Sequence, residues 1–354
     1  MKIAILNDTH ACIRNSSDMF LDYQEKFYRD VFFPYLNENQ IKHIIHLGDY
    51  FDNRRFISIK GLNHHRRVFL SKLREYGITM DLIPGNHDVY YKNTNDLNSL
   101  KELLGHYMNE IHLIMDPVVL EYDGTKIGLI PWINSENEEE CIHFINNCDA
   151  DIIGAHLELS GFEMNKGILC KHGMDMSLFK RFDVVLSGHF HTKSSKGNIH
   201  YLGSQMEFFW NDAADPKYFH IFDTQTREIE AVRNPITIFE KIVYDDTTNV
   251  NYLEMDLDYL NEKFVQVYVE NKTDTFVFDT FIDRIQKRNI HQLKISESFK
   301  DFVGSNVEDA NIKLEDTQSL LNSYVDAVET HLDKDIIKLN LKNLMHEAQE
   351  LELF

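Results

Sequence analysis

Five short apolar runs in this 354-residue chain each stop at residue types that bind metal ions. The runs cover residues 3–6, 44–47, 80–83, 152–155 and 184–186. The side chains that follow them are Asp8, His10, Asp49, Asn86, His156, His189 and His191. Carboxylate, amide and imidazole donors without a thiolate suit Mn, Fe or Zn rather than Mg or Ca alone. The sequence therefore predicts a metal centre assembled from five strand ends.

Asp49 is the predicted centre of this constellation. Two metal ions about 3.5 to 4 Å apart need a bridging carboxylate, and we expect Asp49 to bridge while the other residues complete the two sites. A lone histidine is more often a buried structural residue than a ligand. The motifs D-x-H, G-D-x-x-D, G-N-H-D, H and G-H-x-H, in this order on five strand ends, outweigh that alternative.

The elements that position these residues form an α/β pattern. A run such as 44–47 is typical of a strand buried on both faces, and α/β folds place their sites just past the carboxyl ends of such strands. Helices are predicted at 20–36, 59–76 and 95–104, a further strand at 125–131, and a hairpin from 217–223 and 227–233. We expect Gly77 to end the second helix. The first domain is predicted to span residues 1–240.

Two smaller parts are predicted after this domain. Residues 241–300 are expected to form an α/β capping domain, with strands at 264–269 and 292–295 around a helix at 275–288. Residues 301–354 are expected to form an acidic linker and two amphipathic helices. An amphipathic helix without a core to cover commonly lies in a partner's groove, and folding back on the capping domain is the alternative.

The charge of the chain is unevenly distributed. The formal net charge of −21 argues at first against a polyanionic partner, but residues 235–354 hold 12 Lys and Arg against 24 Asp and Glu and so account for −12 of it. Residues 53–74 contain no acid. Their basic side chains are Arg54, Arg55, Lys60, Arg66, Arg67, Lys72 and Arg74. This segment is either a solvated helix face or a site that attracts a phosphate backbone.

Compartment and membrane signals are simple. The four cysteines form no C-x-x-C pair and no dense framework, which favours reduced thiols in a reducing compartment. No apolar run approaches the roughly 18 residues that a membrane span needs, and Met1 and Lys2 lead directly into a strand. We expect a cytoplasmic protein that does not contact membranes.

In order and spacing, the motifs of residues 1–223 resemble those of the calcineurin-like metallophosphoesterases. More narrowly, they are similar to SbcD/Mre-type DNA repair nucleases, which include phage recombination endonuclease subunits. Gly85 to Asp88, and the Tyr-x-Gly-Ser segment at 201–204 after Gly-His-Phe-His, carry the narrower likeness. The resemblance implies a four-layer αββα sandwich, with 1–240 as the nuclease domain.

The resemblance also implies roles for individual residues. Asp8, His10, Asp49 and His191 would hold one metal, and Asp49, Asn86, His156 and His189 the other, with Mn²⁺ as the expected ion. His87 would be the catalytic histidine that is not a ligand, with Asp88 or Asp52 orienting it. We expect Arg54, Arg55, Arg66 and Arg67 to be the residues of the basic segment that contact DNA.

The implied activity is 3′-to-5′ exonuclease and single-strand endonuclease cleavage in DNA repair and recombination. The implied partners are a second copy of the chain, as a homodimer, and an SbcC/Rad-type coiled-coil ATPase bound through the C-terminal helices. Family homodimers form through the helices that follow the second and third motifs, so the basic segment has dimerisation as a third possible role.

Two other functions remain open. The segment Gly48 to Arg54 also resembles the G-D-Y-V-D-R-G of phosphoprotein phosphatases, although those enzymes usually read G-N-H-E where this chain has Asp88. Some members of the fold have lost ligands and act only as scaffolds. Because every ligand position is filled here, the sequence argues against a scaffold.

Overall fold

The computed structural model describes residues 1–165 and 168–297, together with five residues near the C-terminus. By its contacts the chain divides into two units, Met1–Glu297 and Ser298–Phe354. Most of the second unit, including most of both predicted amphipathic helices, lies outside the described residues. The five that are described there are all helical, namely Val325, Lys334, Ile337, Lys338 and Leu341.

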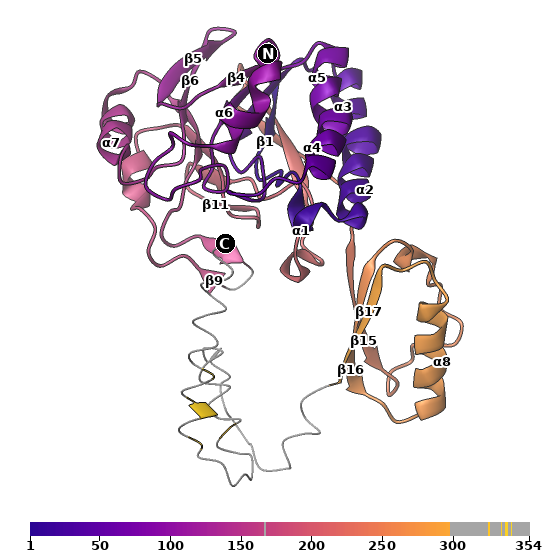
Figure 1. The fold of residues 1–354 in the computed structure, drawn as a ribbon. Coiled ribbons are helices and arrows are strands. Elements are labelled where there is room, and N and C mark those ends of the chain that lie inside the picture. The colour runs from indigo at the N-terminus through magenta and orange to yellow at the C-terminus, as the bar shows by residue number, and fades with distance from the viewer. Residues whose placement is uncertain (166–167, 298–324, 326–333, 335–336, 339–340, 342–354) are drawn as a thin grey trace. The chain divides into compact units, whose positions relative to one another are not determined.

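Two six-stranded sheets form the body of the first unit (Figure 1). The first has the order β14-β13-β1-β2-β3-β4. Its strands are β1 (Lys2–Leu6), β2 (His43–Leu47), β3 (Thr79–Ile83), β4 (Ile111–Leu113), β13 (Tyr218–Asp223) and β14 (Ile229–Arg233). β1 to β4 are parallel, and β13 with β14 makes the predicted antiparallel hairpin.

The second sheet has the order β11-β12-β10-β7-β6-β5. Its strands are β5 (Val118–Tyr122), β6 (Thr125–Ile130), β7 (Ile152–His156), β10 (Val184–Gly188), β11 (Ser194–Lys196) and β12 (Ile199–Tyr201). β6, β7, β10 and β12 run parallel, and Gly188 of β10 pairs with His156 of β7. A separate hairpin joins β8 (Glu163–Asn165) to β9 (Ile168–Leu169).

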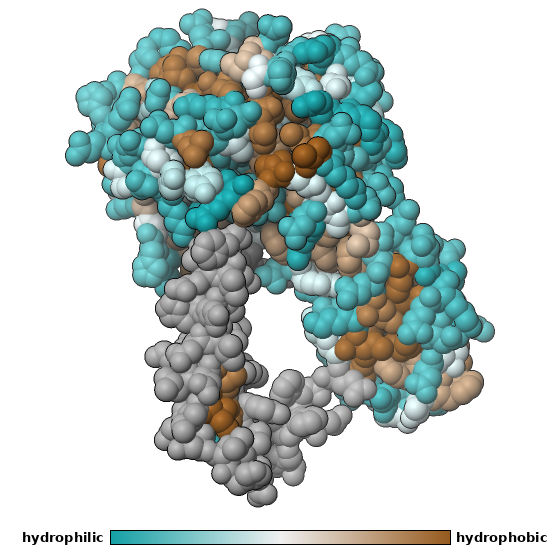
Figure 2. All heavy atoms as spheres, in the orientation of Figure 1, coloured by the Kyte–Doolittle hydropathy of each residue, from teal (hydrophilic) through white to brown (hydrophobic). Residues whose placement is uncertain are grey.

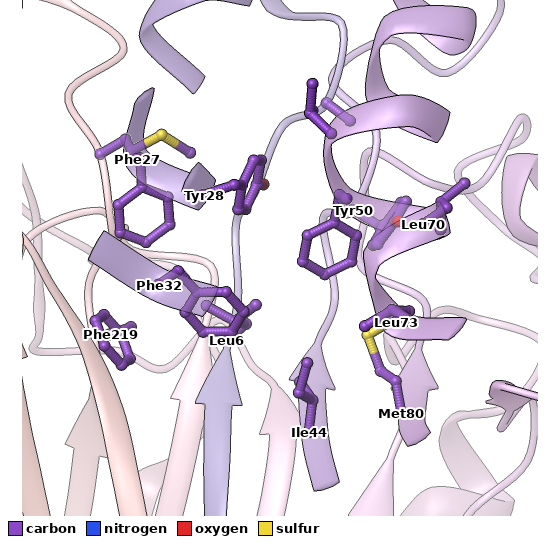
Figure 3. Packing of buried hydrophobic residues seen from close by; sticks show 14 of the residues in the cluster. Leu6, Phe27, Tyr28, Phe32, Ile44, Tyr50, Leu70, Leu73, Met80 and Phe219 are labelled. Atoms are coloured by element: carbon purple, nitrogen blue, oxygen red, sulfur yellow. The ribbon is translucent and has the colours of Figure 1, made fainter. Parts of the chain in front are cut away.

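The alternation of side chains along β1 explains the layers. Ile3 and Ile5 point into a core shared by the two sheets, where they meet Leu129 and Ile152 of the second sheet. Ala4 and Leu6 point to the opposite face, which is covered by α2 (Asp18–Phe27), α3 (Phe33–Glu38), α4 (Ile59–His65) and α5 (Ser71–Tyr76). Figure 3 shows this second core, in which Phe32 lies next to Leu6 of β1 and Leu73 lies next to Met80 of β3. A third core lies on the outer face of the second sheet, under α7 (Glu138–Asn147). The predicted four-layer sandwich is thus confirmed.

The helices follow the predicted pattern with one difference. α1 (Ile13–Ser16) precedes a continuous run formed by α2 (Asp18–Phe27), a π-helical turn (Tyr28–Phe32) and α3 (Phe33–Glu38). A second continuous run is formed by α4 (Ile59–His65), a π-helical turn (Arg66–Leu70) and α5 (Ser71–Tyr76), and Gly77 ends it with a φ of 62° as predicted.

The helix predicted from residue 95 begins four residues later, as α6 (Ser99–Leu104). The Asn98 side chain accepts a hydrogen bond from the Lys101 backbone N–H and so fixes the helix start. α7 (Glu138–Asn147) begins within the acidic segment 136–140, so that Glu138, Glu139 and Glu140 form its first turn. In the described part of the chain, no helix is long and apolar enough to span a bilayer.

A small parallel sheet with its own core follows the two large sheets. It consists of β15 (Phe239–Asp245), β16 (Phe264–Asn271), β17 (Gln292–Glu297) and α8 (Thr275–Gln286). Tyr244, Val265 and Phe281 are fully buried in its core. Figure 2 shows hydrophobic atoms gathered on this part, where Val243, Tyr268 and Ile295 are exposed strand residues. β16, β17 and α8 confirm the strands and the helix predicted here, whereas β15 was not predicted, and the division into domains at 240 and 300 stays a prediction.

Candidate metal centre

The seven predicted ligands come together although they arise from two different sheets. Three strands of the first sheet contribute four of them, since Asp8 and His10 follow β1, Asp49 follows β2 and Asn86 follows β3. The other three come from the second sheet, where His156 ends β7 and His189 and His191 follow β10. Asp8, His10, Asp49 and His156 are buried, and the other three are partly exposed. The carboxyl ends of the two sheets therefore meet at one site.

One group of donors consists of Asp8, His10 and His191, whose ligand atoms lie within 4.8 Å of one another. The Nε2 atoms of His10 and His191 are 3.1 Å apart. His10 Nε2 is also 4.0 Å from Asp8 Oδ1 and 4.0 Å from Asp49 Oδ2. A metal ion with bonds of about 2.1 Å holds its donor atoms about 3 to 4 Å apart. The spacing of this group fits such an ion.

A second group consists of Asp49, His156 and His189, also within 4.8 Å of one another. Asp49 Oδ2 is 3.3 Å from His156 Nε2. The Asn86 Oδ1 atom lies 3.1 Å from His156 Nε2 and 2.9 Å from His189 Nδ1, so it joins this group. Asp49 Oδ2 faces both groups, which is the position that a bridging carboxylate requires. Each ligand set implied by the resemblance is gathered here, and metal binding itself remains a prediction.

Four of these residues have a backbone conformation that L-amino acids rarely adopt. The φ angles are 47° at Asp8, 43° at His10, 53° at Asp49 and 90° at His189. Backbone hydrogen bonds between the loops maintain them, such as Asp8 N–H to Gly48 O at 2.9 Å and His10 N–H to Asp49 O at 3.1 Å. Strain of this kind persists where the surrounding structure over-determines it, commonly at active sites.

Gly48 and Gly85 make the close approach of these loops possible. At Gly48, where φ is 85°, a Cβ atom would lie 2.7 Å from His156 Nδ1. At Gly85 it would lie only 2.3 Å from Asp49 Oδ1. A side chain at either position would therefore displace a ligand, which explains the glycines in G-D and G-N-H-D.

Hydrogen bonds outside the ligand set orient the donors. His156 Nδ1 lies 2.7 Å from the Leu47 carbonyl oxygen and must donate to it, so Nε2 is the atom left for a metal. The Asp8 carboxylate accepts from the His189 N–H at 3.0 Å and from Asn7 Nδ2 at 2.6 Å. Asp49 Oδ1 accepts from the His87 N–H at 2.7 Å, which leaves Oδ2 facing the other ligands.

The buried carboxylates of the site strongly stabilise positive charge next to them. Burial alone would raise the pKa of Asp49, but the charges of His156 and His87 lower it well below its usual value. Burial lowers the pKa of His156, yet the Asp49 carboxylate outweighs it and raises the pKa to about 9. Divalent cations can supply this positive charge, because carboxylates and neutral imidazoles are their ordinary ligands. The donor set thus fits two divalent ions in charge as well as in spacing.

His87 enters the site without joining either ligand group. Its Nδ1 lies 2.6 Å from the Asp52 carbonyl oxygen, to which it must donate, so Nε2 is free to act in the site. Its ring centroid is 4.9 Å from that of His10. The Asp52 carboxylate lies 3.3 Å from His10 Nδ1. The backbone of Asp52 therefore orients the His87 ring.

Asp88 hydrogen-bonds to backbone amides and not to His87, the residue that it was expected to orient. Its carboxylate accepts hydrogen bonds from the backbone N–H groups of Tyr50 at 3.1 Å, Phe51 at 3.0 Å and Gly85 at 2.9 Å. It is fully buried, and its hydrogen bonds go to these amides rather than to His87. The amides converge from the ends of β2 and β3, and a carboxylate satisfies them where a neutral side chain could not. Asp88 thus holds together the loops that carry Asp49 and Asn86.

The arginines of the basic segment have different surroundings. Arg54 is half-buried near Asp49, and burial lowers its pKa. The Arg55 guanidinium lies 5.3 Å over the ring of Tyr90. Arg67 pairs with Glu25 at 2.7 Å, whereas Arg66 is exposed. Ion pairing of Arg67 favours the solvated face there, and Arg54 at the rim of the site favours a phosphate contact.

One buried ion pair beside the site was missed in the sequence. Lys217 and Asp212 are both 4% exposed and lie 2.8 Å apart. The Lys217 ammonium also donates to the His191 carbonyl at 2.9 Å and so fixes a ligand. A lysine at the start of the apolar strand 218–223 was the only signal, and it does not reveal Asp212.

Comparisons with known proteins agree with this geometry. The sequence model of the family described as calcineurin-like phosphoesterase matches residues 1–193. Exonuclease subunit 1 of Enterobacteria phage T4 is 30% identical over 335 residues, which cover 95% of each chain. A solved archaeal phosphodiesterase is 17% identical, and the match covers 66% of this chain and all of that one at a TM-score of 0.35.

Proposed function

Because the chain belongs to the calcineurin-like phosphoesterases, metal-dependent hydrolases of phosphoester bonds, we propose that it is a two-metal DNA nuclease with 3′-to-5′ exonuclease and single-strand endonuclease activity. The observation that carries the proposal is Asp49 Oδ2, which faces both donor groups. The phage relative is named an exonuclease subunit and matches along nearly its whole length, which supports DNA as the substrate. We place the activity in repair and recombination of DNA in a bacterial or phage-infected cell.

The residues of the chain divide the work of hydrolysis. Asp8, Asp49, Asn86, His10, His156, His189 and His191 would hold two divalent ions, which we propose to be Mn²⁺. When bound, these ions would supply positive charge to the phosphoryl oxygens and lower the pKa of a water molecule. In its imidazolium form His87 would give its Nε2 proton to the departing sugar oxygen, while its Nδ1–H donates to the Asp52 carbonyl and keeps the ring in place. Asp88 positions the loops and takes no part in proton transfer.

We further propose that the chain works as a subunit of a larger complex. The name of the phage relative includes the word subunit. The two apolar stripes predicted after residue 316 supply a docking element for a coiled-coil ATPase of SbcC/Rad type, and the helices after the second and third motifs supply a homodimer contact. The ATPase would control access of DNA to the site.

A phosphoprotein phosphatase is the second candidate. Arg54, half-buried near Asp49, offers a guanidinium that could pair with a phosphomonoester, although Asn53 occupies the arginine position of G-D-Y-V-D-R-G. The test is Mn²⁺-dependent cleavage of linear duplex and single-stranded DNA, run beside dephosphorylation of a phosphopeptide. The Asp49→Asn variant serves as the inactive control because a neutral amide cannot bridge two cations. Cleavage of the phosphopeptide but not of DNA would reverse the assignment.

A further inference from the structure

Phe209 is an exposed aromatic residue beside the candidate metal centre. Its side chain is 41% exposed, and its ring lies 6.0 Å from the ring of the ligand His191 at an angle of 17°. A cavity of about 300 Å³ opens here, lined by Phe209, by Met164 and by the ligands His189 and His191. A molecule in this cavity would touch the Phe209 ring and the metal ligands together.

The backbone that carries Phe209 is fixed more firmly than an exposed residue requires. Asp212 Oδ2 accepts from the N–H of Phe208 at 2.8 Å and from the N–H of Phe209 at 2.9 Å. The other Asp212 oxygen pairs with Lys217, which also holds His191. One buried ion pair thus fixes both the aromatic ring and a metal ligand, and their separation is set before any substrate arrives.

Arg14 supports the same ring from a second segment. Its guanidinium lies 5.0 Å from the centroid of the Phe209 ring, and its Nη2 donates to the Phe208 carbonyl at 3.2 Å. Arg14, Asn15 and Ser16 form a left-handed turn, with φ angles of 53°, 54° and 57°. This strained turn, six residues after Asp8, positions an exposed cation next to the Phe209 ring, and backbone strain of this kind clusters at functional sites.

We propose that Phe209, braced by Arg14, is the stacking platform for the base of the nucleotide next to the scissile phosphodiester. The inference rests on the proposed nuclease function and names the part of the substrate that the cavity takes. Every base offers a π face, so stacking positions a strand without sequence preference, as a nuclease of general substrates needs. Arg14 adds a positive charge beside the platform, where the polyanionic strand passes.

The test uses three phosphodiesters that share the leaving group p-nitrophenol. Two carry thymidine, esterified at its 5′ or its 3′ oxygen, and the third carries a methyl group in place of the nucleoside. With the full-length protein and Mn²⁺, Phe209→Ala should raise KM for at least one thymidine ester by roughly 5- to 150-fold, the usual range for one base–aromatic stack. Its kinetics on the methyl ester should stay within about twofold of wild type, because that substrate has no base to stack.

Two further variants separate stacking from packing. Phe209→Leu keeps an apolar side chain but removes the π face, so it should behave like the alanine variant, whereas Phe209→Trp should keep the wild-type KM. Phe276, which is 72% exposed near the start of α8, provides the matched control. Phe276→Ala should leave the kinetics on all three esters unchanged.

The results distinguish the two levels of the proposal. If wild type cleaves single-stranded DNA but Phe209→Ala alters all three esters equally, or none, the platform is refuted and the nuclease function stands. If wild type cleaves the methyl ester or a phosphopeptide but neither thymidine ester nor DNA, the proposed function and the platform both fail.

Discussion

Replacement of Asp88 by asparagine tests the structural role of this carboxylate. The Oδ2 atom accepts from the N–H groups of Tyr50 and Gly85, and the Oδ1 atom accepts from the N–H of Phe51. Asparagine offers one acceptor oxygen in place of two. Whichever way the amide is turned, its NH₂ group faces at least one backbone N–H, so two donors confront each other in a buried position.

The magnitude follows from this count. Loss of a hydrogen bond to a charged group costs about 1.5 to 3 kcal/mol, and leaving a buried donor unsatisfied costs about 1 to 3 kcal/mol. Burial and the charge of Asp49 raise the pKa of Asp88 to about 7, and the neutral amide removes this penalty, which offsets part of the cost. We therefore expect the free energy of unfolding to fall by about 1 to 3 kcal/mol. Because Tyr50 follows Asp49, whose φ of 53° depends on its loop, the bridging carboxylate should lose its position. Affinity for Mn²⁺ should then fall roughly 10- to 100-fold, the usual effect of losing a residue that supports a ligand.

Calorimetric titration of Mn²⁺ into the EDTA-treated variant, together with urea unfolding, measures both effects. Asp274→Asn is the matched control, because Asp274 also accepts two backbone N–H groups, at the start of α8, and asparagine caps helices equally well. It should leave Mn²⁺ affinity unchanged. If Asp88→Asn kept wild-type stability and Mn²⁺ affinity but lost activity, the carboxylate would act on the reaction through His87, and the present reasoning would be refuted.

Four further outcomes are expected. His87→Gln should retain both metal ions, measured by elemental analysis, while the rate falls at least roughly a hundredfold, and loss of metal would contradict its assignment as a residue that is not a ligand. Replacing Arg66 and Arg67 by Gln should lower the slope of log DNA affinity against log salt concentration by roughly one unit per lost phosphate contact. An unchanged slope would favour the solvated helix face. Sedimentation of the same variant tests the homodimer. Burial raises the pKa of Glu207 from 4.5 to about 7, so ionisation of this carboxyl weakens the folded state as pH rises through this window. In urea unfolding, the free energy of unfolding of Glu207→Gln relative to wild type should therefore increase by about 3 kcal/mol between pH 4 and pH 8. A pH-independent difference would contradict this reasoning. A chain ending at Ser305 should keep Mn²⁺-dependent cleavage of single strands but no longer copurify with the ATPase, and full retention of the ATPase would show that the tail is not the docking element.

Local sequence was sufficient for the strand ends and for several helix ends. A run such as 44–47 that stops at Gly48 and Asp49 predicts a buried strand, and the structure has a strand there. Gly77 ends a helix for a local reason, because glycine adopts the left-handed conformation without steric cost. The candidate metal ligands could also be recognised from local sequence, because each lies at or within a few residues of the end of a strand.

Only the tertiary structure decided how these pieces meet. Apolar periodicity shows that 44–47 and 152–155 are buried strands, but it does not show that they belong to different sheets, because strand pairing depends on contacts far apart in sequence. The partners of Asp88 and the buried pair of Asp212 and Lys217 depend in the same way on loops that fold over one another. A side chain's type and neighbours in sequence state what it can bind, whereas its partner is chosen by the packing of distant segments, which no local pattern records.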